Sequence, residues 1–157
     1  MAENIDIPYT TNEGIDYLIK FTLFPADRLP EKITIPVVDI VIETDTDIND
    51  IKNSAYSLMQ ITQIISDYAI ENNAIYYCYC SDKPIKRAER KKHLTHQEYR
   101  SLLFCKMFEK NNNSDFINKT VIVNDVQKGN HHIHLITKLE NEYMVNIISE
   151  TLSQFDK

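Results

Sequence analysis

Glycine is scarce in this 157-residue chain, which contains only Gly14 and Gly129. Phosphate-binding loops of the Walker type and of the dinucleotide-binding type each need several glycines, because the backbone must approach the phosphates closely. Two isolated glycines therefore exclude both kinds of loop. No other catalytic signature is recognisable in the sequence, so composition and motifs alone assign no activity.

Long apolar runs and cysteines are also few. No run approaches the ~20 apolar residues that a membrane-spanning helix needs. The N-terminal stretch lacks the basic and apolar regions of a signal peptide. Three cysteines, an odd number, favour reduced thiols in a cytoplasm over a disulfide framework. We therefore expect a soluble cytoplasmic protein that has no membrane partner.

The remaining composition is that of one globular domain, with 43% hydrophobic and 10% aromatic residues. Alternating and β-branched patterns predict strands over 5–11, 15–24, 33–43, 74–80, 116–125 and 131–139. Apolar residues at steps of three and four predict helices within 45–73, from 83 to 108 with a restart or kink near Thr95, and over 141–155. The prediction is a single α+β domain over 1–157, in the order β-β-β-α-β-α-β-β-α. Its mixed sheet has five or six strands, with three helices mainly on one face.

Several details of this domain are predicted as well. Pro36 removes a donor from the third strand, so we expect that strand at a sheet edge or with a bulge. The strand over 74–80 is expected in the middle of the sheet. Thr95 and Glu98 have the spacing of a capping box. The core is predicted to contain Ile51, Leu58, Ile61, Ile65, Ile75, Cys78, Leu103, Met107, Val121, Val123, Leu135 and Ile148.

The most unusual feature is a block of positive charge directly after the apolar strand "AIYYCYC". Between Lys83 and Lys92 the sequence has six cations and one anion, although the chain as a whole has a formal net charge of -6. Four of the cations are spaced i, i+3, i+4 and i+7, which would place them on one face of a helix. The sequence therefore predicts a basic helix over 83–92.

Such a helix attracts phosphate or carboxylate groups through its orphan amide donors and its side-chain charge. Asp82 can cap it, and Tyr79 on the preceding strand can stack a base beside the positive surface. We predict an anion- or partner-binding site formed by Lys83, Lys86, Arg87, Arg90, Lys91, Tyr79 and Asp82. The alternative is a solvated helix face that offsets the protein's own acidic residues.

Histidines and cysteines are the other candidates for chemistry. In "HHIHL", His132 and His134 point to one face of a strand and His131 to the other. The pair could supply half of a metal site, with Asp125 or His96 completing it. No HExxH motif occurs, and Cys105, the third cysteine, lies in a helical core pattern. We therefore expect no metal and no cofactor, and the sequence assigns no catalytic residue.

Parts of the sequence resemble a known family. The strand "GIDYLIKF" has the pattern Gly-hydrophobic-x-Tyr-x-hydrophobic-x-Phe. The strand "YYCYCSD" ends in a Cys/Ser-Asp pair and leads into the spaced-arginine segment "KRAERKKHLTHQEYRSLLFCKMF". This arrangement is similar to a family of small bacterial proteins known as a domain of unknown function, over most of the chain. The resemblance implies no activity, cofactor or catalytic residue. In that family an aromatic pair follows the arginine helix, and Tyr99 with Phe104 or Phe108 would supply this pair here. The "HLTH" interruption departs from the family pattern.

Three functions follow as hypotheses. The first is a non-enzymatic binding protein whose basic helix contacts RNA, DNA, a nucleotide or an acidic protein, in a toxin–antitoxin, immunity or phage-conflict module. Its rival is a small nuclease-like or phosphate-processing enzyme that uses His132, His134 and Asp82 beside the basic face. In the third, the acidic remainder of the surface contacts a basic toxin. An enzyme needs the histidines and the basic helix to line one concavity, whereas a binding protein does not.

Overall fold

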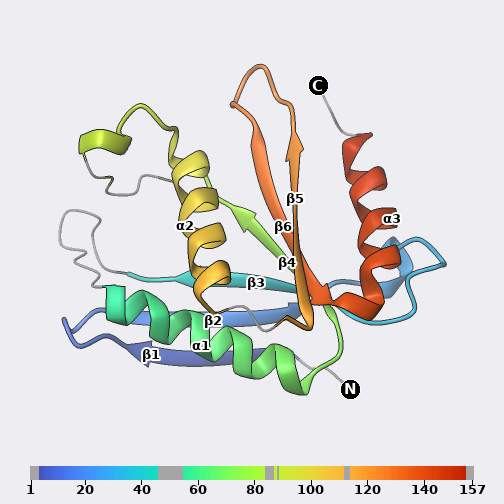
Figure 1. The fold of residues 1–157 in the computed structure, drawn as a ribbon, viewed down its shortest axis with the longest axis horizontal. Helices are drawn as coiled ribbons and strands as arrows, with labels where there is room; N and C mark the ends of the chain where they lie inside the picture. Colours follow the sequence, from blue (N-terminus) through green and yellow to red (C-terminus); the bar gives the residue numbers. More distant parts are fainter. Residues whose placement is uncertain (1–3, 46–54, 84–86, 88, 112–113, 155–157) are drawn as a thin grey trace.

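The computed structural model describes residues 4–45, 55–83, 87, 89–111 and 114–154. Within these residues, six strands form one sheet in the order β1-β2-β3-β4-β6-β5 (Figure 1). The strands are β1 (Ile5–Thr10), β2 (Asp16–Leu23), β3 (Val37–Glu43), β4 (Ile75–Cys80), β5 (Phe116–Val123) and β6 (His131–Lys138). The helices are α1 (Ala55–Glu71), α2 (His96–Asn111) and α3 (Glu142–Ser153), with short 3-10 turns η1 (Ala26–Arg28), η3 (Glu89–Lys91) and η4 (Leu139–Asn141).

The predicted α+β class and element order are confirmed. Neighbouring strands are antiparallel except for β3 and β4, which are parallel because α1 carries the chain back across the sheet between them. The sheet is therefore mixed, as expected. Within the described ranges, no helix is both long enough and apolar enough to cross a membrane.

Helices cover both faces of the sheet. On one face, Ile61 and Tyr68 of α1 are buried with Phe21 and Tyr76 of the strands, and α2 packs beside them. On the other face, α3 forms a second cluster with the strands, to which it contributes Met144, Val145 and Ile148. Successive strand side chains alternate between these two clusters. Two of the three helices thus share a face, and α3 covers the opposite one (Figure 1).

The position of β3 corrects one expectation. It is an interior strand between β2 and β4, neither at the edge nor bulged. It begins at Val37, so Pro36 precedes the ladder and removes no donor from it. The carbonyl of Pro36 still contributes, since it accepts a hydrogen bond from the amide of Ile75 at 2.9 Å. The strand predicted to be central, now β4, does lie between β3 and β6.

Strands β3 and β4 stay paired for only a short distance. Their register couples Val37–Asp39 with Ile75–Tyr77 and then ends, although β3 continues to Glu43 and β4 to Cys80. Beyond this point β3 follows β2, while β4 follows β6. Figure 1 shows the two strands diverging beneath α2. The sheet is therefore open between its two halves at the carboxyl ends of β3 and β4.

This opening explains why the predicted core is only partly closed. Six of the predicted core residues are fully buried: Ile61, Ile75, Val121, Val123, Leu135 and Ile148. Five others are only half-buried and line a groove or lie beside it: Leu58, Ile65, Cys78, Leu103 and Met107. Ile51 lies outside the described residues. The prediction of a single shared core is wrong, because the buried residues divide into one cluster on each face of the sheet.

Candidate functional site

The charged segment after β4 does not form the predicted helix. Of its described residues, only Glu89–Lys91 are helical, as the single 3-10 turn η3, and α2 begins at His96. Lys83 and Arg87 lie in no helix. Lys86 falls outside the described residues. The predicted face of four cations on one helix is therefore wrong for the residues that the structure describes.

Two physical effects account for this correction. Cations at helical spacing repel one another, and the segment has one carboxylate, Glu89, to offset six of them. Arginine side chains also bind backbone carbonyls here. Arg87 Nη1 donates to the carbonyl of Leu94, and Arg100 Nη1 donates to the carbonyls of Ser81, at 2.7 Å, and Lys83. These bonds tie the described residues Ser81, Lys83 and Arg87 to the start of α2.

The start of α2 is fixed by the predicted capping box. The Thr95 amide donates to Glu98 Oε1 at 2.9 Å, and the Glu98 amide donates to Thr95 Oγ1 at 3.2 Å. The hydrogen bond from the Thr95 amide is the main cause that lowers the pKa of the Glu98 carboxyl. The restart predicted near Thr95 is thus confirmed, and α2 begins as a separate helix at His96.

Three of the five described cations of the basic segment are exposed to solvent. Lys83 and Arg90 are exposed, whereas Arg87 and Lys91 are half-buried. Lys92 forms an exposed ion pair with Glu89 at 2.6 Å, inside the segment itself. Among the described residues, no carboxylate forms an ion pair with Lys83, Arg87, Arg90 or Lys91.

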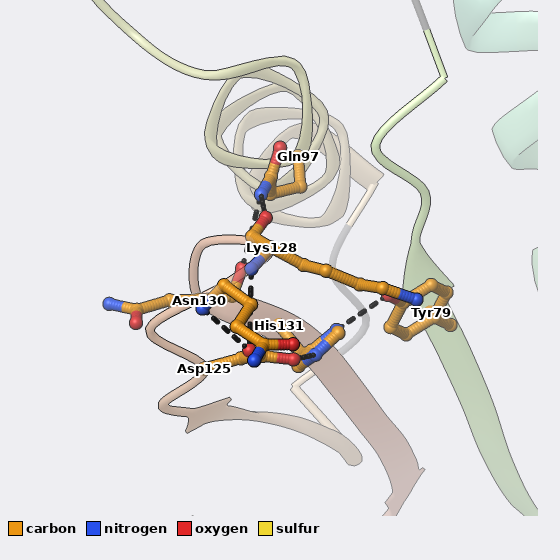
Figure 2. Close-up of polar contacts among 7 residues, drawn as sticks. Tyr79, Gln97, Asp125, Lys128, Asn130 and His131 are labelled. Carbon is orange, nitrogen blue, oxygen red and sulfur yellow. Dashed lines mark hydrogen bonds and ion pairs between the residues drawn. The ribbon is translucent and has the colours of Figure 1, made fainter. Parts of the chain in front are cut away.

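Tyr79 belongs to a hydrogen-bonded chain that ends at a buried acid (Figure 2). Its hydroxyl donates to Nδ1 of His131 at 2.7 Å, and Nε2 of His131 donates to Asp125 Oδ2 at 2.9 Å. The other oxygen of Asp125 accepts from the backbone amides of Gln127 and Lys128. Asp125 is 7% exposed and Tyr79 is 42% exposed. The chain therefore runs from a buried carboxylate to an accessible hydroxyl.

This arrangement orients an imidazole for proton transfer. Because Asp125 accepts from Nε2, the neutral ring has its lone pair on Nδ1, where it can accept a proton. Tyr79 occupies that position, and burial, followed by the negative charge of Asp82, raises the pKa of its hydroxyl. Tyr79 therefore stays protonated and donates to the ring. The sequence pointed to Tyr79 but not to His131 as its partner, since only the pairing of β4 with β6 brings them together.

His134, a candidate of the rival hypothesis, is inaccessible. It is 0% exposed, and its ring stacks on Phe104 of α2 with centroids 4.5 Å apart. Nε2 lies 2.8 Å from Ser101 Oγ, and Nδ1 lies 3.1 Å from Asn118 Oδ1 and 3.2 Å from Thr120 Oγ1. Burial, together with His132, lowers the pKa of His134 to about 4. This neutral imidazole ties α2 to β5 and β6.

His132 and the cysteines offer little further chemistry. His132 lies on the α2 side with His134, and burial lowers the pKa of its imidazole. Burial raises the pKa of the Cys80 thiol to about 12, and all three cysteines are free. In the part of the chain that the structure describes, no group of three or more histidine, cysteine or acidic side chains is arranged to hold a metal ion.

A groove of about 1130 Å³ opens where β3 and β4 separate, between α1 and α2. Leu58 and Ile65 of α1 form one wall, and Leu103 and Met107 of α2 form the other. Lys83 and Arg100 stand where β4 ends, and Asn111 lies at the far end of α2. Sequence reasoning missed this groove because apolar residues at helical spacing look the same whether they face a closed core or a cleft.

Comparison with known proteins identifies no relative of this chain. The chain matches no family model, and no curated protein or solved structure is significantly similar to it.

Proposed function

We propose that the protein is a cytoplasmic, non-enzymatic binding protein that contacts an anionic partner through the basic segment after β4. The contact residues are Lys83, Arg90 and Lys91, with Tyr79 beside them. Lys86, which is outside the described residues, keeps its predicted place in the site. The partner carries phosphate or carboxylate groups, as nucleic acids, nucleotides and acidic proteins do. Such a protein suits a toxin–antitoxin, immunity or phage-conflict module.

One observation supports this function over the alternative that the cations only offset the protein's own acids. That alternative requires the cations to pair with carboxylates of the same chain. Among the described residues, Lys92 has such a partner, but Lys83, Arg87, Arg90 and Lys91 do not. Unpaired surface cations close together raise the local positive potential and attract anions, even when the net charge of the protein is negative.

The loss of the predicted helix changes the role of single residues. Arg87 donates to the carbonyl of Leu94, and Arg100 to the carbonyls of Ser81 and Lys83, so both arginines shape the segment. Asp82 caps none of the described helices, since the next described helical turn begins at Glu89. Arg90 and Lys91 are the cations whose replacement tests binding with the least disturbance of structure.

The experiment compares two double charge reversals. Arg90→Glu with Lys91→Glu changes the basic segment, and Lys106→Glu with Lys110→Glu makes the same charge change at exposed positions on α2. Affinity for labelled single-stranded RNA and DNA, and for poly-glutamate as an acidic chain, is measured across a salt titration. We expect the first variant to bind at least about tenfold more weakly, with a salt slope for the single-stranded nucleic acids shallower by about 1.4, while the second stays close to the parent.

Two results would contradict the proposal. Equal weakening in both variants would mean that only total charge matters. Failure of the parent to bind any of the three probes at low salt would remove the anionic partner altogether. Binding of poly-glutamate but not of nucleic acid would identify the partner as an acidic protein and leave the role of the segment intact.

A second candidate function is an enzyme that acts on a phosphate ester held by the basic segment. The Asp125–His131–Tyr79 chain favours it, since it has the geometry of an oriented general base. In this enzyme His131 is the catalytic histidine, in place of the predicted His132 and His134. The test is hydrolysis of bis(p-nitrophenyl) phosphate. Activity in the parent and in His132→Gln that is lost in His131→Gln would establish the enzymatic function. No turnover by the parent on this ester or on RNA would count against it.

A further inference from the structure

The groove between α1 and α2 is bordered by two unpaired strand edges. Beyond Asp39 on β3 and Tyr77 on β4, the ladder between these strands ends while each strand continues. Backbone groups of Ile40–Glu43 and Cys78–Cys80 that face the gap have no strand partner among the described residues. An edge of this kind is a template for one more extended chain.

The side walls of the groove are apolar. Leu58 and Ile65 of α1 face Leu103 and Met107 of α2, and all four remain half-buried. Ile42 of β3 stands at the rim with 43% of its surface exposed. Apolar pockets that keep such residues partly in contact with water gain free energy when a ligand covers them.

The two ends of the groove differ in polarity. Arg100 and Lys83 place positive charge where β4 ends, and the acidic Glu43 and Asp45 lie where β3 ends. At the opposite end, Nδ2 of Asn111 is buried and has no hydrogen-bond partner among the described residues. The open edge of β3 runs from Ile40 to Glu43, four residues that extend about 13 Å at ~3.3 Å per residue. An extended peptide that pairs with this edge and reaches the cations beyond it has about five residues.

We propose that the groove binds an extended peptide of about five residues that pairs with the open edge of β3. Its alternate side chains are apolar and lie against α1 and α2. Its C-terminal carboxylate lies at Arg100 and Lys83, and a carbonyl near its other end accepts from Asn111. This site goes beyond the proposed function, with which it shares Lys83 and Tyr79.

A fatty acid is the main competitor for the same walls and cations. Its acyl chain would cover Leu103 and Met107, but it carries no donors or acceptors for the strand edges of β3 and β4. A peptide matches both the apolar walls and the edges, because its backbone presents donors and acceptors at the strand repeat. The unpaired edges therefore favour the peptide.

The test is selection from a random peptide library displayed with free C-termini, using the whole protein as bait. We expect peptides with alternating apolar residues to be enriched. A synthetic copy of the best peptide should lose at least about tenfold in affinity when its carboxylate is amidated. Its binding should slow amide hydrogen exchange in Ile40–Glu43. Sodium laurate is measured as a second probe, alone and in competition.

Adjacent leucines of α2 supply a matched control. Leu103 lines the groove and Leu102 does not, and both are half-buried. Leu103→Gln should lower the affinity for the selected peptide at least about tenfold, and Leu102→Gln should leave this affinity unchanged. Ile42→Lys changes an exposed position at the rim and should also weaken peptide binding. It replaces Leu103→Gln as the test if that variant fails to fold.

The outcomes separate this site from the basic segment. The Arg90→Glu and Lys91→Glu variant should retain peptide binding, and Leu103→Gln should retain nucleic-acid binding, so either proposal can fail alone. An absence of enriched peptides, or equal binding by the Leu103→Gln, Ile42→Lys and parent proteins, would overturn the peptide site. Binding of laurate that displaces the peptide without slowing exchange in Ile40–Glu43 would assign the groove to acyl chains instead.

Discussion

Helices cover both faces of the sheet, but the two faces reach different degrees of closure. On the α3 face, Met144, Val145 and Ile148 are fully buried against the strands. On the face covered by α1 and α2, apolar residues such as Leu58 and Leu103 stay half-buried around a groove. The same helical periodicity therefore leads to a closed core in one place and to an open cleft in the other.

The difference originates in the sheet beneath the helices. Beneath α3, β5 and β6 pair over their full length of eight residues, so the helix rests on a continuous surface. Beneath α1 and α2, β3 and β4 pair over three residues and then separate. A helix can bury its apolar stripe only against a surface that fills the space below it. The opening of the sheet thus creates the groove.

The largest expected effect is a difference between the two faces in the free energy of unfolding that a leucine truncation removes. Leu135→Ala removes a fully buried side chain on the α3 face and should lower the free energy of unfolding by about 2–5 kcal/mol. Leu58→Ala should cost about 1–2 kcal/mol, because the side chain is half-buried and solvent can fill the space that it leaves. Urea denaturation of both variants measures the two values. Equal losses would mean that the α1 side is as closed as the α3 side.

The next prediction concerns His134, a buried polar residue that joins α2 to the sheet on the open face. Burial holds the pKa of His134 at about 4, compared with 6.5 in an unfolded chain. Below pH 6.5 the unfolded chain therefore binds a proton that the folded protein does not, so stability is complete above pH 6.5 and falls as the pH drops towards about 4. The loss should reach about 2–3 kcal/mol. The groups in contact with the ring are uncharged: Ser101, Phe104, Asn118 and Thr120.

Denaturation curves between pH 7 and pH 4 measure this loss, and hydrogen exchange locates it. We expect α2 to lose protection at higher pH than α3, because His134 joins α2 to β5 and β6. His134→Gln should flatten the pH dependence in this window, whereas His132→Gln, at the half-buried neighbour, should retain most of it. A parent protein equally stable at both pH values would show that His134 accepts a proton without loosening α2.

Much of this fold was predictable from local patterns, and the exceptions share a cause. Alternation and helical periodicity predicted every strand and helix in order, and the Thr95–Glu98 spacing predicted the start of α2. These signals depend on residues close together in the sequence. The open part of the core was not predictable, because the separation of β3 from β4 depends on how distant strands pair.

The candidate site shows the same limit. The spacing of the cations predicted a helix over 83–92, but it could not show that Arg87 and Arg100 would bind the carbonyls of Leu94, Ser81 and Lys83. The Tyr79–His131–Asp125 chain depends on the register of β4 with β6, in which Tyr79 pairs with Ile133. Neither result follows from local spacing.

The smallest expected effect concerns Asn111, at the far end of the groove. Its Nδ2 is buried without a hydrogen-bond partner among the described residues, and an unpaired buried donor is destabilising. Asn111→Leu removes that donor and extends the apolar wall of α2, so it should stabilise the protein by about 0.5–1 kcal/mol. The same change should weaken the selected peptide, which loses the donor for its carbonyl. A variant that is less stable than the parent in urea would show that Asn111 already supports the fold. The open face would then end before Asn111, and the groove would be shorter than the span from Arg100 to the end of α2.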